Sequence, residues 1–192
     1  MTELATFLQI DLQSLFGPLN RKKMDFDKIW EHFNGRETEF LTGTFIYTIK
    51  NLDFDSTRFE QKLKSIGYDL RIKTLPRASG RYRGDNNTAA PINHNLNLTI
   101  DCMSHIDRFD KVILMTNNGV FGDLCKFLKE KGKKIELWSF SDNYDPSLEL
   151  YADKLHFIDD TFCMQKPSIS VFGANWGLEK FHSLFDSTTS YV

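Results

Sequence analysis

The sequence is poor in cysteine, proline and glycine, carries almost no net charge, and contains no long apolar run. Its 192 residues include 3 Cys, 5 Pro and 11 Gly, without repeats or biased tracts, which excludes disulfide scaffolds, collagen-like rods and solenoids. The longest strongly apolar runs, such as residues 112–115, fall far short of the ~20 residues that span a membrane. With 24 basic and 26 acidic residues, the net charge of −2 provides no global basic field for nucleic acid.

Two further absences concern the compartment. No basic segment precedes the first apolar residues, so no secretory signal is expected, and the three widely spaced cysteines include no CxxC pair. We therefore expect a cytoplasmic protein with reduced, buried thiols and no association with a membrane.

The sequence is rich in core-forming residues, with 41% hydrophobic residues and 17 Phe. Short apolar strands alternate with amphipathic helices, which indicates a three-layer α/β/α sandwich with a mostly parallel central sheet. The expected strands cover residues 5–11, 41–50, 68–74, 111–116, 134–140 and 156–158. The expected helices cover residues 26–34, 53–66, 93–109, 121–132 and 146–154. The first and fourth strands are expected to be central.

The third expected helix carries two stripes at helical spacing. The apolar stripe, which we expect to be buried, consists of Leu96, Ile100 and Met103. The polar stripe consists of His94, Asn97, Asp101 and His105. We expect the polar stripe to form an outer face from which only Asp101 turns inward, and the wall of a polar site is the alternative.

A basic segment at residues 69–83 is the clearest local charge feature. It holds five basic residues, one acid and a tyrosine between two arginines: Arg71, Lys73, Arg77, Arg81, Arg83, Asp69 and Tyr82. Basic side chains neutralise phosphates, and tyrosine stacks on unpaired bases, as in single-stranded RNA recognition. A solvated loop is the alternative interpretation.

Polar residues follow the two strands that we expect to be central. Asp11 ends the first strand, and Thr116, Asn117, Asn118 and Gly119 follow the fourth. Ligands of open parallel sheets bind at this carboxyl edge. An acid at the end of an apolar strand needs a hydrogen-bond partner, a capping role or a cation, and these alternatives stay open here.

Three segments carry a family pattern: IDLQSLF at residues 10–16, VILMTNNGVFGDLCKFLKEKGKKIELWSF at 112–140, and ELYADKLHFIDD at 149–160. NYN domains show D-G-S-N-L-F after the first strand, K-G-V-D-V-x-L-x-x-D at the third helix, and S-G-D-G-D-F after the fourth strand. Residues 5–160 resemble this domain, in the LabA-like branch of the PIN-like nuclease superfamily. The resemblance implies a PIN-like fold.

The resemblance also implies a site with few of its expected acids. In the family, carboxylates at the sheet edge hold Mg²⁺ or Mn²⁺, which activates water for attack on an RNA phosphodiester. Two of the expected acids are kept, as Asp11 and Asp101, and would form a weak metal site. Asn95, Asn118 and Val120 stand where the family has other acids.

Substitute groups are available nearby in the sequence. Asp123 follows Val120 by about one helical turn and could replace a missing carboxylate, and His94 could act as a base or ligand. The resemblance implies Asp11, Asp101, Asn95 and Asn118 as the candidate catalytic set, with Asp123 as a substitute; a solvent-facing Asp123 on the fourth helix is the alternative.

We expect an RNA-binding protein that is impaired or inactive as a nuclease, for single-stranded or structured RNA. The predicted RNA contacts are Ser14, Lys73, Arg77, Arg81, Tyr82, Arg83 and Asn117. Two alternatives stay open: an active Mg²⁺- or Mn²⁺-dependent endoribonuclease with a rearranged ligand set, and a protein-interaction or assembly factor that uses the fold as a scaffold. The sequence leaves open whether the protein is an enzyme.

Residues 1–160 are expected to form the NYN/PIN-like domain, and residues 161–192 a C-terminal extension. A strand at 168–172 and a short helix at 178–185 are predicted in the extension. Its aromatic residues are Phe162, Phe172, Trp176, Phe181 and Phe185. We expect the extension to pack on the same domain or to form an interface with another copy or another protein.

Overall fold

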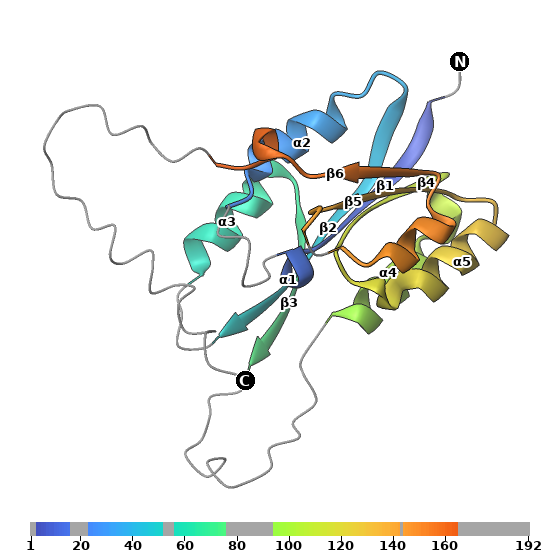
Figure 1. The fold of residues 1–192 in the computed structure, drawn as a ribbon. Coiled ribbons are helices and arrows are strands. Elements are labelled where there is room, and N and C mark those ends of the chain that lie inside the picture. Colours follow the sequence, from blue (N-terminus) through green and yellow to red (C-terminus); the bar gives the residue numbers. More distant parts are fainter. Residues whose placement is uncertain (1–2, 16–22, 52–55, 76–93, 143, 165–192) are drawn as a thin grey trace, which may run out of the picture.

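A computed structural model describes residues 3–15, 23–51, 56–75, 94–142 and 144–164 (Figure 1). The strand expected at 168–172 and the helix expected at 178–185 lie outside these residues. The same holds for Arg77, Arg81, Tyr82 and Arg83 of the basic segment.

The core of the fold is a parallel sheet of six strands with the order β3-β2-β1-β4-β5-β6. The strands are β1 (Leu4–Asp11), β2 (Glu39–Asn51), β3 (Asp69–Leu75), β4 (Lys111–Met115), β5 (Lys134–Ser139) and β6 (Lys154–Phe157). The predicted fold class is confirmed, as is the central position of the first and fourth strands.

Helices cover both faces of this sheet. They are α1 (Leu12–Leu15), α2 (Phe26–Asn34), α3 (Thr57–Ile66), α4 (Asn95–Ser104) and α5 (Gly122–Glu130), with 3₁₀ turns η1 (Ile106–Arg108), η2 (Gly119–Phe121), η3 (Pro146–Tyr151) and η4 (Asp160–Phe162). α2 and α3 lie on one face and α4 and α5 on the other (Figure 1). From the central strand β1, the chain builds the sheet toward one edge through β2 and β3. It then returns to the center at β4 and builds toward the other edge through β5 and β6. Because crossovers between parallel strands are right-handed, this reversal of direction places α2 and α3 on one face and α4 and α5 on the other.

Local signals explain where α2 and α3 stop. α2 begins after Asp25, whose carboxylate accepts a hydrogen bond from the Lys28 amide at 3.3 Å, and it ends before Gly35. α3 ends at Gly67, whose φ of 121° suits glycine, and a Cβ at this position would meet the Trp30 ring.

Two apolar clusters fill the spaces between sheet and helices. The larger cluster joins β1, β4 and β5 to α2 and includes Leu8, Ile10, Ile29, Phe33 and Ile113. The other joins the opposite sheet face to α4 and α5 and includes Phe7, Tyr47, Leu98, Val112 and Leu124. The three cysteines are buried free thiols, as expected. None of the helices in the described ranges has the length and apolarity needed to cross a bilayer.

The predicted orientation of the third helix is wrong. In α4 the buried apolar residues are Leu98 and Cys102, whereas Leu96, Ile100 and Met103 are exposed. Two residues expected on the polar outer face lie inward instead, because His94 is buried and His105 stacks on Phe7. Asp101 is half-buried and Asn97 is exposed, as predicted. The helix has apolar residues on two sides, so its periodicity could not decide which side meets the sheet. It also ends at Ser104 rather than near Phe109.

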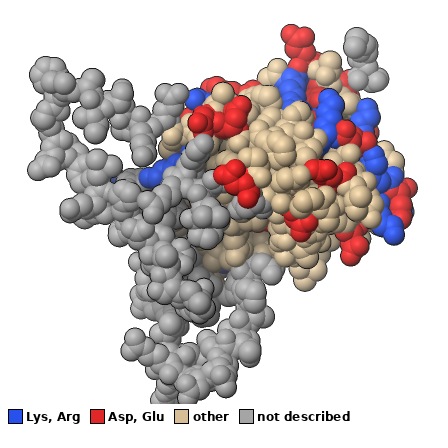
Figure 2. All heavy atoms as spheres, in the orientation of Figure 1, with Lys and Arg blue, Asp and Glu red and all other residues tan. Residues whose placement is uncertain are grey.

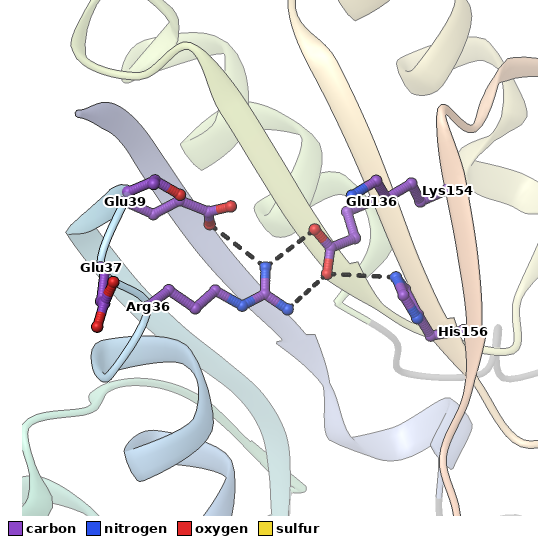
Figure 3. Close-up of a pocket in the computed structure, with 7 residues that line it drawn as sticks. Arg36, Glu37, Glu39, Glu136, Lys154 and His156 are labelled. Carbon is purple, nitrogen blue, oxygen red and sulfur yellow. Dashed lines mark hydrogen bonds and ion pairs between the residues drawn. The ribbon is translucent and has the colours of Figure 1, made fainter. Parts of the chain in front are cut away.

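A buried charge network lies at the amino-terminal edge of the sheet, where it lines an open cavity of about 440 Å³ (Figure 3). The Arg36 guanidinium donates to both oxygens of Glu136, at 2.8 and 3.0 Å, and also to Glu39. The ammonium of Lys111 lies 2.9 Å from Glu136 and 2.5 Å from Glu39. Each buried charge in the network is paired with an opposite charge, so we infer that the network stabilises the fold.

Glu136 is the center of that network and sets a pH dependence. Burial alone would raise the pKa of Glu136, but hydrogen bonds from its two cations and Trp138 lower it to about 2, below the ordinary 4.5. The stabilisation is therefore present above pH 4.5 and is lost as the pH falls toward 2. We expect Glu136→Gln to reduce the free energy of unfolding at pH 7 by about 3 kcal/mol, because Lys111 then loses a buried partner.

Urea denaturation of the wild type, Glu136→Gln and the exposed control Glu37→Gln between pH 2.5 and 7 checks this expectation. Glu136→Gln should show a shallower loss of stability below pH 4.5 than the wild type, and Glu37→Gln should follow the wild type. Equal acid dependence of all three proteins would contradict the assignment.

Candidate functional site

The candidate site lies where β1 and β4 end side by side. β1 leads toward β2 and β3, and β4 leads toward β5 and β6, so the direction of the sheet connections switches between them. Such a switch point leaves room for a ligand at the carboxyl edge. Asp11 ends β1, and residues 116–119 follow β4, as the sequence predicted.

Asp11 is held by neighbouring donors and is only 3% exposed. Its Oδ2 accepts a hydrogen bond from the Thr116 hydroxyl at 3.0 Å, and its Oδ1 accepts one from the Ser14 amide at 3.4 Å. The second contact caps the short helix α1. Of the roles considered for this acid, the structure thus provides both a hydrogen-bond partner and a cap.

Ser14 and Asn117 connect the loops around this acid. The Ser14 hydroxyl lies 2.9 Å from the Thr116 hydroxyl and accepts a hydrogen bond from the backbone N–H of Asn117 at 3.1 Å. The Asn117 side chain donates to the Ser14 carbonyl and accepts from the Ser139 hydroxyl and the Phe140 amide. Both residues were predicted to contact RNA, but their polar groups are engaged in joining the ends of β1, β4 and β5.

The two asparagines at family acid positions contact each other. The Asn118 side chain donates to the Asn95 Oδ1 at 3.4 Å, which connects η2 to the start of α4. The backbone N–H of Asn118 donates to the Thr116 hydroxyl at 3.1 Å. The Asn118 Oδ1 caps η2 by accepting a hydrogen bond from the backbone N–H of Val120. A continuous chain of polar contacts therefore runs from Asp11 through Thr116 and Asn118 to Asn95.

His94 precedes Asn95 and fixes the start of α4. It is 2% exposed, and its Nε2 donates to the Thr48 carbonyl at 2.5 Å. Its Nδ1 is buried without a hydrogen-bond partner in the part of the chain that the structure describes. Burial lowers the pKa of His94, which favours the neutral ring, with Nδ1 as an acceptor.

Asp101 belongs to a separate network between α4 and the sheet. Its Oδ2 accepts hydrogen bonds from the Arg71 guanidinium at 2.9 Å and from the Tyr47 hydroxyl at 3.1 Å. Gln9 donates to that hydroxyl and to the Leu98 carbonyl of α4. Burial, followed by the Asp101 carboxylate, raises the pKa of Tyr47 far above its ordinary value, so the phenol stays a donor.

This network changes the expected role of Arg71. Its guanidinium lies 4.1 Å from the center of the Phe45 ring and is paired with Asp101, so it joins β3 to α4. The sequence predicted that Arg71 binds phosphate together with the other basic residues at positions 69–83. Lys73 lies two residues further along β3, in the part of that strand nearest the sheet's carboxyl edge.

The remaining candidates lie on the surface. Asp123 is exposed in the first turn of α5, and Val120 is exposed in η2. In the view of Figure 2, basic and acidic side chains are intermixed along the side of the molecule where α5 lies. Along that side, the described residues therefore form no continuous basic surface.

The polar groups at the sheet edge do not fit a divalent metal as a ready ligand set. Mg²⁺ and Mn²⁺ favour several carboxylate oxygens as ligands. The Asp11 carboxylate instead accepts hydrogen bonds from Thr116 and Ser14, and the Asp101 carboxylate forms an ion pair with Arg71. Within the described ranges, no three His, Cys, Asp or Glu side chains are grouped so that they could hold a metal.

Sequence reasoning missed the roles of the residues that organise the site. Thr116, named only as a residue after the fourth strand, braces the Asp11 carboxylate. Gln9 and Tyr47, which were not singled out, anchor α4 to β1 and β2. A signal exists for Gln9 and Thr116, because they are polar residues within or just after strands that are mostly apolar, where a buried polar group needs a partner. Tyr47 has no such signal, because β2 carries several other polar residues.

Comparison with known proteins gives the chain its family. The NYN domain family model matches residues 5–160. The low amplitude and bright protein LabA of Synechococcus elongatus is 25% identical over 132 residues, which cover 68% of this chain and 70% of that protein. A crystal structure of a protein of unknown function from Vibrio parahaemolyticus has a TM-score of 0.71 at 20% identity, covering 84% of this chain and 97% of that one, and shares the fold. The chain belongs to the NYN domain family, which has a PIN-like nuclease fold.

Proposed function

We propose that this protein is an RNA-binding NYN domain that has lost metal-dependent cleavage. The observation that carries the proposal is the direct contact between the Asn118 side chain and the Asn95 Oδ1 at 3.4 Å. Carboxylates at these two positions would repel each other and need a cation between them, whereas two amides attract each other. This pair is stable without a metal.

Two features support RNA as the ligand. NYN domains are generally associated with RNA, and a phosphate approaching Asn95 and Asn118 meets amides instead of unneutralised carboxylates. The basic residues Arg77, Arg81 and Arg83, with Tyr82 among them, stand in the sequence between β3 and α4, the helix that begins at Asn95. They would supply the positive charge and the stacking surface that single-stranded RNA needs.

The first prediction concerns this basic segment. We expect replacement of Arg77, Arg81 and Arg83 by Ala to weaken the binding of labelled single-stranded RNA at least about tenfold at low salt. The slope of log K against log salt concentration should fall in magnitude by about 2, because each lost phosphate contact removes about 0.7. Fluorescence anisotropy at several salt concentrations measures both quantities.

The matched control removes three positive charges elsewhere. Arg58, Lys126 and Lys134 are exposed on α3, on α5 and at the start of β5. Their replacement by Ala should leave the salt slope close to that of the wild type. Equal losses in both triple variants would indicate a response to net charge alone and would refute the assignment of the basic segment.

The second prediction restores the family's acids. We expect the triple variant Asn95→Asp, Asn118→Asp and Val120→Asp to unfold at a lower temperature than the wild type without metal, because carboxylates then face one another. Mn²⁺ at 100 times its Kd should recover about 2.7 kcal/mol of stability. Thermal unfolding with Mn²⁺ or EDTA measures this effect, and labelled RNA in the same buffers reports any gain of cleavage.

Two additional variants make the test specific. Asp11→Asn in the triple variant should abolish both the Mn²⁺ stabilisation and any cleavage, whereas Asp123→Asn should leave them unchanged. Metal-dependent cleavage by the wild type that is lost in Asp11→Asn would contradict the proposal and would favour an active endoribonuclease with a rearranged ligand set.

A further inference from the structure

α4 presents an apolar stripe to the outside of the molecule. Leu96, Ile100 and Met103 are 67%, 52% and 46% exposed, although Leu98 and Cys102 of the same helix are completely buried. A helix that is apolar on two sides normally has a partner on each of them. The sheet is the partner on one side, and the described residues leave the other side uncovered.

A further exposed apolar residue lies on η2, beside the candidate site. Val120 of η2 is 58% exposed, and η2 packs against α4. Val120 lies two residues after Asn118, and Asn118 contacts Asn95, the residue before Leu96. We call these four exposed residues, Leu96, Ile100, Met103 and Val120, the α4 patch.

The α4 patch is of the size that one short amphipathic helix covers. Its four partly exposed aliphatic side chains offer on the order of 400 Å² of apolar surface. A patch of this size is better suited to a segment of the same chain, because the connecting chain keeps the effective concentration of that segment high.

We propose that residues 178–185 of this chain form an amphipathic helix that docks on the α4 patch. Leu178, Phe181, Leu184 and Phe185 recur at helical spacing, and Glu179, Lys180, His182 and Ser183 occupy the other positions. The apolar stripe thus spans about two turns, as Leu96, Ile100 and Met103 do on α4. Two such stripes pack together by the ordinary geometry of helix pairs.

The connecting chain is long enough. The described chain ends at Met164, just after Cys163 pairs with Met24 before α2, on the face of the sheet opposite α4. Thirteen residues, 165–177, can span up to roughly 45 Å when fully extended, which is about the diameter of a compact domain with a radius of gyration of about 15 Å. This length allows a path around the edge of the sheet to α4.

Hydrogen–deuterium exchange of the full chain tests the docking. We expect the amides of residues 178–185 to exchange at least about tenfold more slowly than an unstructured chain, and Ile100→Lys or Phe181→Lys to abolish that protection. Asn97→Lys, also exposed on α4, and Glu179→Lys, on the polar side of the predicted helix, are the matched controls and should retain it. Unchanged exchange in α5 verifies that each variant is folded.

Two results would overturn the inference. One is exchange of residues 178–185 at unstructured rates in the wild type, and the other is protection that persists in Ile100→Lys. Light scattering over a range of concentrations resolves the competing occupant: a dimer that Ile100→Lys dissociates and Phe181→Lys leaves intact would assign the α4 patch to a second copy. None of these readouts depends on RNA binding, so the inference stands or falls independently of the proposed function.

Discussion

β1 pairs with β2 on one side and with β4 on the other, and this pairing positions the residues of the candidate site at the carboxyl edge of the sheet. It brings the carboxyl end of β1, at Asp11, next to the first residue after β4, Thr116. A hydrogen bond between these two side chains then fixes a buried carboxylate that would otherwise be costly. The loops after β1, β4 and β5 are joined through Ser14 and Asn117 around this pair.

α4 depends on the same sheet through a second set of polar contacts. Gln9 and Tyr47 rise from β1 and β2, and Arg71 rises from β3, so three neighbouring strands hold one helix. Because Asp101 accepts from both Arg71 and Tyr47, it positions α4 rather than standing beside Asp11 as a second metal ligand. Asn95 is thereby placed against Asn118.

Most of the fold could be predicted from the pattern of apolar residues. Alternating strands and helices indicate a parallel sheet, and the capping signals Asp25 and Gly35 delimit α2 to the residue. The site was predictable in part: the resemblance pointed to Asp11, Asn95 and Asn118, which one chain of contacts connects, whereas Asp101 belongs elsewhere. The braces Thr116 and Tyr47 were missed because their importance arises only when separate strands meet.

The sequence by itself determined the fold class, the NYN resemblance and the shortage of acids at the sheet edge, since each depends on residue identity and spacing along one chain. Only the tertiary structure decided which side of α4 is buried and which carboxylate is paired with which donor. The physical reason is that α4 has apolar residues on two sides, Leu98 on one and Ile100 on the other. The helical periodicity of the sequence fits burial of either side of α4. The hydrogen bonds that Gln9 and Arg71 donate to α4 fix which side faces the sheet.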